Sequence, residues 1–273
     1  MDTRFWGPSG WCLLHLVAAA PASARVKEWI ELLEYVLPCK YCRASFHDYL
    51  NLQPLTVAIV RDRDAFSRWL YDIHNRVNGK LRGQGLLTTQ DPSWPSVRDR
   101  YYTMQAGLCD TKPFIGWDFM TSVAFSTPAA NYKPVPMADT PEEGAPTDIR
   151  GRNRYNLLTR SERLAKLKRW WNLIPSILPC SAWRSAWAAA AAEHPPPLAA
   201  GREAVMRWMW QVEETVCDGL KCPTPHPSLP ALRRDVAAFE SPCSSQKRGR
   251  TCRTRKRRER LRVLQSRKRL ARE

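Results

Sequence analysis

Apolar residues recur at three- and four-residue intervals along most of the first 220 or so positions, which predicts amphipathic helices rather than strands. Four such stripes come first, over residues 11–18, 29–37, 46–50 and 66–77, and Gly79 and Gly83 mark the end of the last one. Almost nothing alternates with a period of two. The predicted fold class is therefore all-α, with an N-terminal four-helix bundle, a second helical bundle and a basic tail.

The second half of the chain repeats the plan of the first. Trp29 and Trp170 each begin a stripe that ends ten residues later in Leu-Pro-Cys, at Cys39 and at Cys180. An Arg-Trp pair recurs in the same order in the fourth stripe of each half, and the stripe after Trp117 parallels the one after residue 11. Shared tryptophans and a shared Leu-Pro-Cys at equal spacing predict a tandem duplication.

Polar and reactive positions are not repeated, whereas the apolar positions are. Cys42 of the first half corresponds to Trp183, and the histidine at position 74 corresponds to Glu213. This difference predicts a second bundle that folds but no longer catalyses. The predicted domains are a catalytic bundle (1–95), a linker with a short helix near 98–104 (96–113), a degenerate bundle (114–222), a Pro-rich connector with one helical piece near Leu232 (223–246) and a disordered basic tail (247–273).

The formal charge of +17 comes mostly from the end of the chain, because residues 246–273 hold 14 Lys and Arg against 2 acids. One interpretation of this tail is a disordered, solubilising end. The other, which we favour, is a patch for nucleic acid or for a nuclear import receptor.

The start of the chain lacks a secretory pattern and no segment is long enough to span a membrane, so we expect a soluble intracellular protein. In such a protein nine cysteines favour catalysis, metal binding or redox work over a disulfide scaffold. Cys39 and Cys42 are the most informative of them. Two thiols at this spacing can close a disulfide across the first turn of a helix, where the helix N-terminus favours the thiolate. Taken alone, the pair is a weak signal that fits half a zinc site, a redox pair or chance, and the zinc site would add His47 and one further ligand.

Three motifs together resemble the Erv/ALR family of flavin-dependent sulfhydryl oxidases. They are Trp6-Gly7 running to Leu14-His15, then Pro38-Cys39-Lys40-Tyr41-Cys42, and then His74-Asn75 with Val77-Asn78 and Lys80-Leu81. The duplicated layout is similar to members, some from large DNA viruses, in which a degenerate bundle takes the place of a dimer partner. The residues that the resemblance assigns to FAD are Gly7, Trp11, His15, His74, Asn75, Val77, Asn78, Lys80, Leu81 and, in an uncertain register, Trp94.

The resemblance implies a thiol oxidase in which protein dithiols reduce the Cys39–Cys42 disulfide and electrons pass through FAD to O2, forming hydrogen peroxide. Cys39 is then the outward, attacked sulfur, and Cys42 faces the flavin. The implied partners are protein thiols, with a thioredoxin-like carrier among them, and a second copy of the chain. The implied location is the cytoplasm or nucleus of a host cell, or a virion, without membrane attachment.

The chain departs from the family pattern at two places. Tyr71 and Thr88 stand where many relatives carry a structural disulfide, and we expect packing of the second bundle to compensate. Ala20 stands where an aromatic residue often precedes the proline after the first helix. The other cysteines are open: Cys12 as a buried apolar residue, Cys180 as an inert relic, Cys109 without an evident partner, and Cys217 with Cys222 or Cys243 with Cys252 as a shuttle pair.

Three classes of function therefore compete. They are the flavin-linked thiol oxidase, a zinc-binding module, and a basic nucleic-acid-binding protein whose helices are only a scaffold. The combined motifs favour the oxidase.

Overall fold

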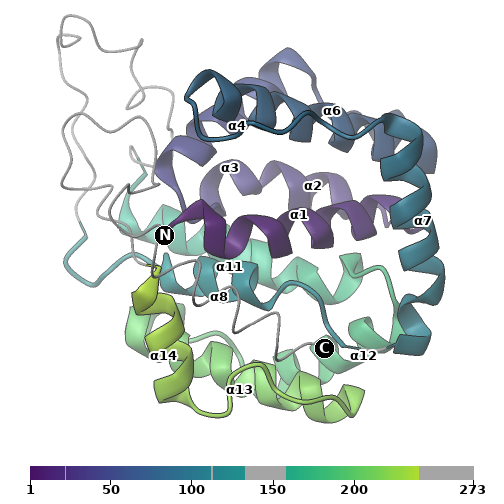
Figure 1. Cartoon of the computed structure of the whole chain (residues 1–273). Coiled ribbons are helices and arrows are strands. Elements are labelled where there is room, and N and C mark those ends of the chain that lie inside the picture. Colours follow the sequence, from purple (N-terminus) through teal and green to yellow (C-terminus); the bar gives the residue numbers. More distant parts are fainter. Residues whose placement is uncertain (22, 112, 133–157, 240–273) are drawn as a thin grey trace, which may run out of the picture.

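The computed structural model describes residues 1–21, 23–111, 113–132 and 158–239, except the side chains of residues 109–111 (Figure 1). Every regular element in these ranges is a helix, which confirms the all-α prediction. The first half contains α1 (Thr3–Ala19), α2 (Val26–Glu31), α3 (Leu33–Val36), α4 (Lys40–Leu52), α5 (Val57–Arg61), α6 (Arg63–Gly83) and α7 (Trp94–Thr111). The second contains α8 (Trp117–Phe125), α11 (Arg160–Ile177), α12 (Ser181–Glu193), η1 (Leu198–Ala200), α13 (Arg202–Leu220) and α14 (Leu229–Ala238).

Helices α1, α5 and α6 of the first half begin at side-chain caps. Asp2 accepts a hydrogen bond from the backbone N–H of Arg4 (2.9 Å) and so caps α1, and Asp62 caps α6 by accepting from Ala65 N–H (2.9 Å). The stripe predicted over residues 29–37 forms two short helices, because the turn at Leu32 has ψ −15°. Leu37 is then extended (ψ 135°), as expected for a residue before proline.

The second half reaches the same geometry with one continuous helix. A capping box of Thr159 and Glu162 starts α11, which runs to Ile177. Leu178 is extended (ψ 141°) before Pro179, as Leu37 is before Pro38. The helical piece predicted near Leu232 is α14, whereas the short linker helix predicted near 98–104 is the 18-residue α7.

Two hydrogen bonds recur at matching places in the halves. Arg43 Nη1 donates to the carbonyl of Leu37 (2.6 Å), and Arg184 Nη1 donates to the carbonyl of Leu178 (2.9 Å). The second recurring bond runs from a tryptophan of the fourth stripe to the residue after the helix that follows Leu-Pro-Cys. It links Trp69 Nε1 to the Gln53 carbonyl (3.0 Å) and Trp208 Nε1 to the His194 carbonyl (2.6 Å).

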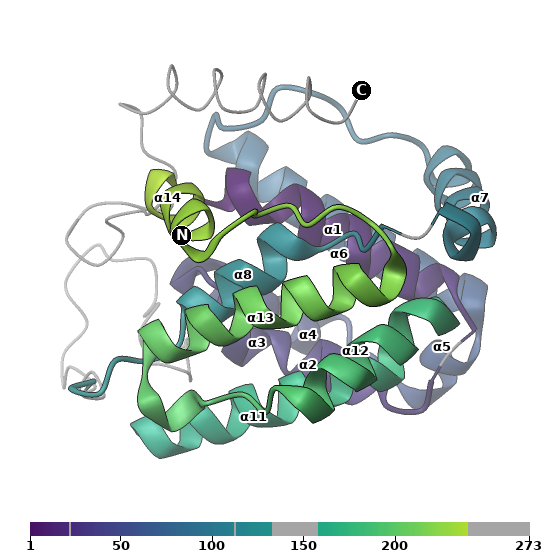
Figure 2. The ribbon, with the colours of Figure 1, turned by 90° about the horizontal axis from the view of Figure 1, so that it is seen from below.

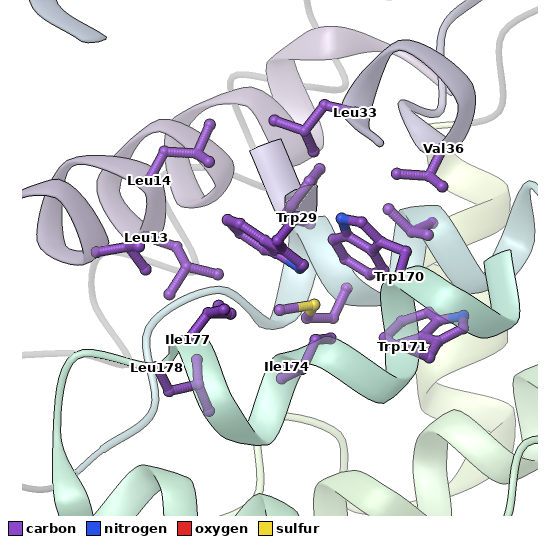
Figure 3. Packing of buried hydrophobic residues seen from close by; sticks show 14 of the residues in the cluster. Leu13, Leu14, Trp29, Leu33, Val36, Trp170, Trp171, Ile174, Ile177 and Leu178 are labelled. Atoms are coloured by element: carbon purple, nitrogen blue, oxygen red, sulfur yellow. The ribbon is translucent and has the colours of Figure 1, made fainter. Parts of the chain in front are cut away.

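The two halves share one core, at whose centre Trp29 and Trp170 stack with ring centroids 5.5 Å apart and planes 16° apart (Figure 3). Both rings are fully buried. Helices α1 and α8 pack against each other, and α11 packs against α2 and α3. In Figure 2, α8 lies between α1 and α13, so the junction runs through the middle of the molecule.

Helix α7 runs across the bundle, nearly perpendicular to α1 and α6, and packs against both (Figure 1). None of the described helices is both long enough and apolar enough to cross a membrane. The predicted basic tail, with Cys243 and Cys252, and most of the loop between α8 and α11 lie outside the described residues.

Candidate redox and cofactor site

The Cys39–Cys42 pair lies across the first turn of α4. Cys39 is the residue before the helix, with extended backbone, and its carbonyl accepts hydrogen bonds from the backbone N–H groups of Cys42 and Arg43 (3.0 Å each). Both cysteines are present as thiols. Cys39 is only 2% exposed, whereas Cys42 is partly exposed.

The surroundings of Cys39 favour its thiolate. Burial by itself raises the pKa of Cys39, but the thiol and backbone N–H of Cys42, the Arg43 guanidinium and the amino group of Met1 together lower that pKa to about 6. The pKa of Cys42 is raised, first by its hydrogen bond to Cys39 and then by burial. A neighbouring cation and a helix N-terminus are the usual causes of a reactive cysteine, and both occur here.

A cavity of about 470 Å³ opens next to this pair. Its walls come from α1, α3, α4, α6, α7 and, through Phe119, α8, and they are largely apolar and aromatic. Cavities of this size and character are typical of sites for small molecules and cofactors. The predicted site residues that line it are Gly7, Trp11, Cys39, Cys42, His74, Val77, Asn78, Lys80 and Leu81.

Helical spacing explains which residues of α6 reach the cavity. Val77 and Asn78 lie three and four residues after His74, and Leu81 lies four and three residues after these two, so all four share one face of the helix. Asn75 falls beside this face and does not line the cavity.

His15 stands one layer away from the cavity wall. Its Nε2 lies 3.1 Å from Nδ1 of His74, within hydrogen-bond distance, while the ring of His74 stacks on Trp11 (centroids 3.9 Å, planes 8°). Burial is the main cause that lowers the pKa of His15 to about 3 and that of His74 to about 4. Both imidazoles are therefore neutral at pH 7, so that one ring nitrogen of the pair donates and the other accepts.

The aromatic residue that α7 contributes to the cavity is Tyr101 rather than Trp94. Tyr101 lines the cavity and stacks on His15 (centroids 4.5 Å, planes 12°), whereas Trp94 packs against Tyr71 (5.5 Å) at the start of the helix. No sequence motif pointed to Tyr101. The residue lies in the helical piece predicted near 98–104, and that helical pattern is the one sequence feature that could have indicated it.

Trp6 is another wall residue that was not among the predicted cofactor contacts. It lines the cavity, and its buried indole N–H has no hydrogen-bond partner in the described part of the chain. Tryptophan N–H groups usually find a partner when they are buried. Within the described residues the indoles of Trp29, Trp170, Trp171 and Trp187 share this feature, so Trp6 contributes an aromatic wall to the cavity rather than a donor specific to a ligand.

Charged and polar groups gather at one part of the cavity. Lys80 hydrogen-bonds to Ser45 of α4, and Asn78 Nδ2 donates to Asp91 Oδ1 (2.7 Å), which also pairs with Arg82. Lysine beside an apolar cavity supplies the cation that a pyrophosphate needs. The donor set therefore fits FAD: aromatic walls, a few directed polar groups and one cation.

The missing structural disulfide is replaced locally. Tyr71 donates its hydroxyl hydrogen bond to the carbonyl of Pro92 (3.0 Å), and Arg82 donates to the carbonyl of Thr89 (3.1 Å). These bonds tie α6 to the segment before α7. Compensation for the missing disulfide by packing of the second bundle stays a prediction.

The other cysteines lie outside this cavity. Burial raises the pKa of the Cys12 thiol on α1, and Cys217 and Cys222 are hydrogen-bonded thiols at the end of α13. Cys180 is in a disulfide whose partner lies outside the described side chains. Cys109, also an open case, has no described side chain.

A zinc site is not favoured by the described residues. They contain no group of three or more His, Cys, Asp or Glu side chains placed to hold a metal ion. His47, the third ligand that we considered, instead bonds through Nδ1 to Glu34 (2.6 Å) and through Nε2 to Asn51 (3.1 Å).

A thiol pair on a helix N-terminus lies in the wall of an aromatic cavity inside a helical bundle, an arrangement that suits dithiol redox chemistry next to a bound cofactor. A sequence profile described as the Erv1 / Alr family matches residues 8–99. A FAD-linked sulfhydryl oxidase of African swine fever virus is 35% identical over 103 residues, which cover 35% of this chain and 79% of that protein. The chain belongs to the Erv1 / Alr family, which confirms the resemblance found in the motifs.

Two further relatives match over a similar number of residues. A probable FAD-linked sulfhydryl oxidase of Acanthamoeba polyphaga mimivirus is 35% identical over 95 residues, 32% of this chain and 66% of that protein. The mitochondrial FAD-linked sulfhydryl oxidase of Saccharomyces cerevisiae is 33% identical over 88 residues, 30% of this chain and 45% of that protein. The chain thus spans just under two thirds and just under half the length of these two. No solved structure matches the chain significantly.

Proposed function

We propose that the chain is a FAD-dependent sulfhydryl oxidase that forms disulfides in protein thiols. The observation that carries the proposal is that Cys39 and Cys42 line the same cavity as Trp11, His74 and Lys80. Family membership supports it, since the three relatives described above are named FAD-linked sulfhydryl oxidases. Gly7, Trp11, His74, Val77, Asn78, Lys80 and Leu81 would hold the cofactor, together with Trp6 and Tyr101.

The chain's own residues perform the thiol–disulfide exchange. One substrate thiolate attacks the Cys39–Cys42 bond, forming a mixed disulfide and releasing the other cysteine as a thiolate. The second substrate thiolate then attacks the substrate sulfur of this mixed disulfide, which forms the substrate disulfide and releases the attacked cysteine as a thiolate. The cysteine pair is then reduced and holds the two electrons. The chemistry that bound FAD supplies is the transfer of those two electrons to O2, which yields hydrogen peroxide.

Each role has a structural support. The lowered pKa of Cys39 makes it a stable thiolate at neutral pH. Lys80 acts on the other cysteine, because its charge opposes the rise in the pKa of Cys42. The neutral His15–His74 pair keeps uncompensated charge out of an apolar wall. The division in which Cys39 is attacked and Cys42 faces the flavin remains a prediction.

Purification tests the proposal directly. The protein should be yellow, and it should consume oxygen with dithiothreitol as the substrate. Cys39→Ala and Cys42→Ala should each abolish oxygen consumption, whereas Cys222→Ala, a partly exposed thiol outside the cavity, should retain it. Colourless protein with stoichiometric zinc, or equal loss in all three variants, would contradict the proposal.

We also propose that the second half, over about 114–222, is a non-catalytic copy that takes the place of a dimer partner. The recurring hydrogen bonds of Arg43 and Arg184 support this. Trp183, at the position of Cys42, is fully buried and packs edge-on against Phe114 (4.9 Å), so aromatic rings fill that interior. One FAD per chain is the expected ratio, and two per chain would contradict the proposal.

The finer assignments of partner and place are proposals of the same kind. Protein dithiols, including a thioredoxin-like carrier, would be the substrates, and the viral relatives favour action inside a host cell. The basic tail would bind nucleic acid or a nuclear import receptor, and association of two chains would add a second interface. A tail-deleted variant with unchanged salt-dependent retention on nucleic acid and unchanged cellular distribution would refute the role of the tail.

A further inference from the structure

Access to the Cys39–Cys42 pair is restricted. Both cysteines line the cofactor cavity, so a bound cofactor would cover the faces that they turn toward it. The rest of Cys39 is packed against the protein, which leaves that residue only 2% exposed. A substrate thiolate must contact a sulfur atom of the disulfide, so the chain that covers Cys39 decides which thiols react.

The first turn of α1 borders Cys39. Thr3, Arg4 and Trp6 line the same cavity as Cys39. The amino group of Met1 also lies close enough to act on the charge of that cysteine. This turn is itself ordered by Asp2, which is buried, caps α1 and pairs with the Arg4 guanidinium.

The far end of the chain holds this turn in place. The backbone N–H of Asp2 donates to the carbonyl of Phe239 (2.9 Å), and the rings of Phe5 and Phe239 stack with centroids 4.6 Å apart. Phe239 follows α14, whose end lies beside the N-terminal end of α1 in both Figure 1 and Figure 2. These contacts are one hydrogen bond and one ring pair at the ends of two helices, where local opening needs the least free energy.

We propose that Asp2, Phe5 and Phe239, here called the clasp, form a gate that determines which dithiols reach Cys39. With the clasp closed, small dithiols reach the pair more readily than a cysteine on a folded protein does. Release of Phe239 frees the first turn of α1 and opens the approach to Cys39. The proposal rests on the proposed thiol oxidase function, and it adds the second half of the chain as the part that sets substrate size.

Phe239→Ala tests the gate, and Leu232→Ala is the matched control. Both truncate a buried apolar side chain of the α14 region, but Phe239 stacks on Phe5 of α1, whereas α14 itself packs against α13 and α8. The substrates are dithiothreitol and reduced thioredoxin. We expect Phe239→Ala to raise the ratio of kcat/KM for thioredoxin over dithiothreitol at least about tenfold, which is about 1.4 kcal/mol. Leu232→Ala should leave the ratio near that of the unchanged chain.

A second measurement does not depend on turnover. The reduced protein is treated with a polyethylene glycol maleimide, and peptide mass spectrometry follows the labelling of Cys39 relative to that by N-ethylmaleimide. Phe239→Ala should accelerate the bulky reagent selectively. An equal effect of both variants, or no effect of either, would overturn the gate. Absence of dithiothreitol oxidation in the unchanged chain would instead refute the oxidase function, while the labelling still reports on the clasp.

Discussion

Nε2 of His15 and Nδ1 of His74 lie 3.1 Å apart, and this contact joins α1 to α6 directly behind the Trp11–His74 stack. Burial keeps both rings neutral. Because His74 lines the cavity, protonation of either ring would disturb the cavity wall.

Acid should destabilise the protein through this pair. An unfolded histidine has a pKa of about 6.5. The folded pKa is about 4 for His74 and about 3 for His15, so the unfolded chain binds more protons between these values. The stabilisation is complete above about pH 6.5 and is lost as the pH falls through 4, with about 3 kcal/mol from His74 alone by pH 4.

Denaturant unfolding of the chain at several pH values measures this loss. His74→Phe removes one titrating ring and should flatten the pH dependence between pH 6.5 and 4. An unchanged slope in this variant would show that the neutral pair is not its source.

The thiolate of Cys39 should form at unusually low pH. With burial opposed by Cys42, Arg43 and the Met1 amino group, the pKa of Cys39 is about 6. The ultraviolet absorbance of the thiolate in the reduced protein should show one transition near that pH, which Cys39→Ser removes. Cys222→Ser is the control and should keep it. A first transition at the pH of an ordinary thiol would refute the assignment.

The stacked Trp29 and Trp170 should couple the two halves. Either ring replaced by Ala removes a fully buried indole, so each variant should lose about 3 to 5 kcal/mol of unfolding free energy. The double variant should lose less than the sum by about 1 kcal/mol, because the ring pair can be lost only once. Additive losses, or separate unfolding transitions for the halves, would contradict a shared core.

Alkali should loosen the contact between α13 and the segment before α14. Burial alone would lower the pKa of His226, but Asp235 and Glu213 outweigh it and raise that pKa to about 9. Nδ1 of His226 lies 2.8 Å from Glu213 Oε2. The stabilisation is complete below about pH 6.5, amounts to about 2 to 3 kcal/mol at pH 7, and disappears as the pH rises through 9.

His226→Gln checks this prediction by unfolding at pH 7 and at pH 10. The free energy of unfolding of the variant should be lower than that of the unchanged chain at pH 7 and close to it at pH 10. A difference that is equally large at both pH values would mean that packing, not charge, explains the loss.

Local patterns in the sequence predicted most of the helices because burial repeats with the helix period. The stripes around Trp29, Phe66, Trp170 and Trp208 all became helical, and the Cys39–Cys42 pair lies on a first turn as expected. The break at Leu32 and the extra helix α5 were missed, since they depend on packing against α11 and α6 rather than on periodicity.

The sequence predicted the candidate site less well where segments that are distant in the chain come together. Trp94 was named for α7, yet Tyr101 reaches the cavity, because the length of α7 sets which of its faces meets α1. Phe239 holds the first turn of α1 through Asp2 and Phe5, and no local pattern brings residues so far apart in sequence together.

The most direct test is anaerobic titration of the purified, flavin-loaded protein with dithiothreitol, with the ratio of flavin to chain measured first. We predict one FAD per chain and bleaching of its visible absorbance in the unchanged protein, but no bleaching in Cys39→Ala or Cys42→Ala. A protein without flavin, or a flavin that bleaches equally without the two cysteines, would contradict a thiol pair acting on a cofactor in this cavity.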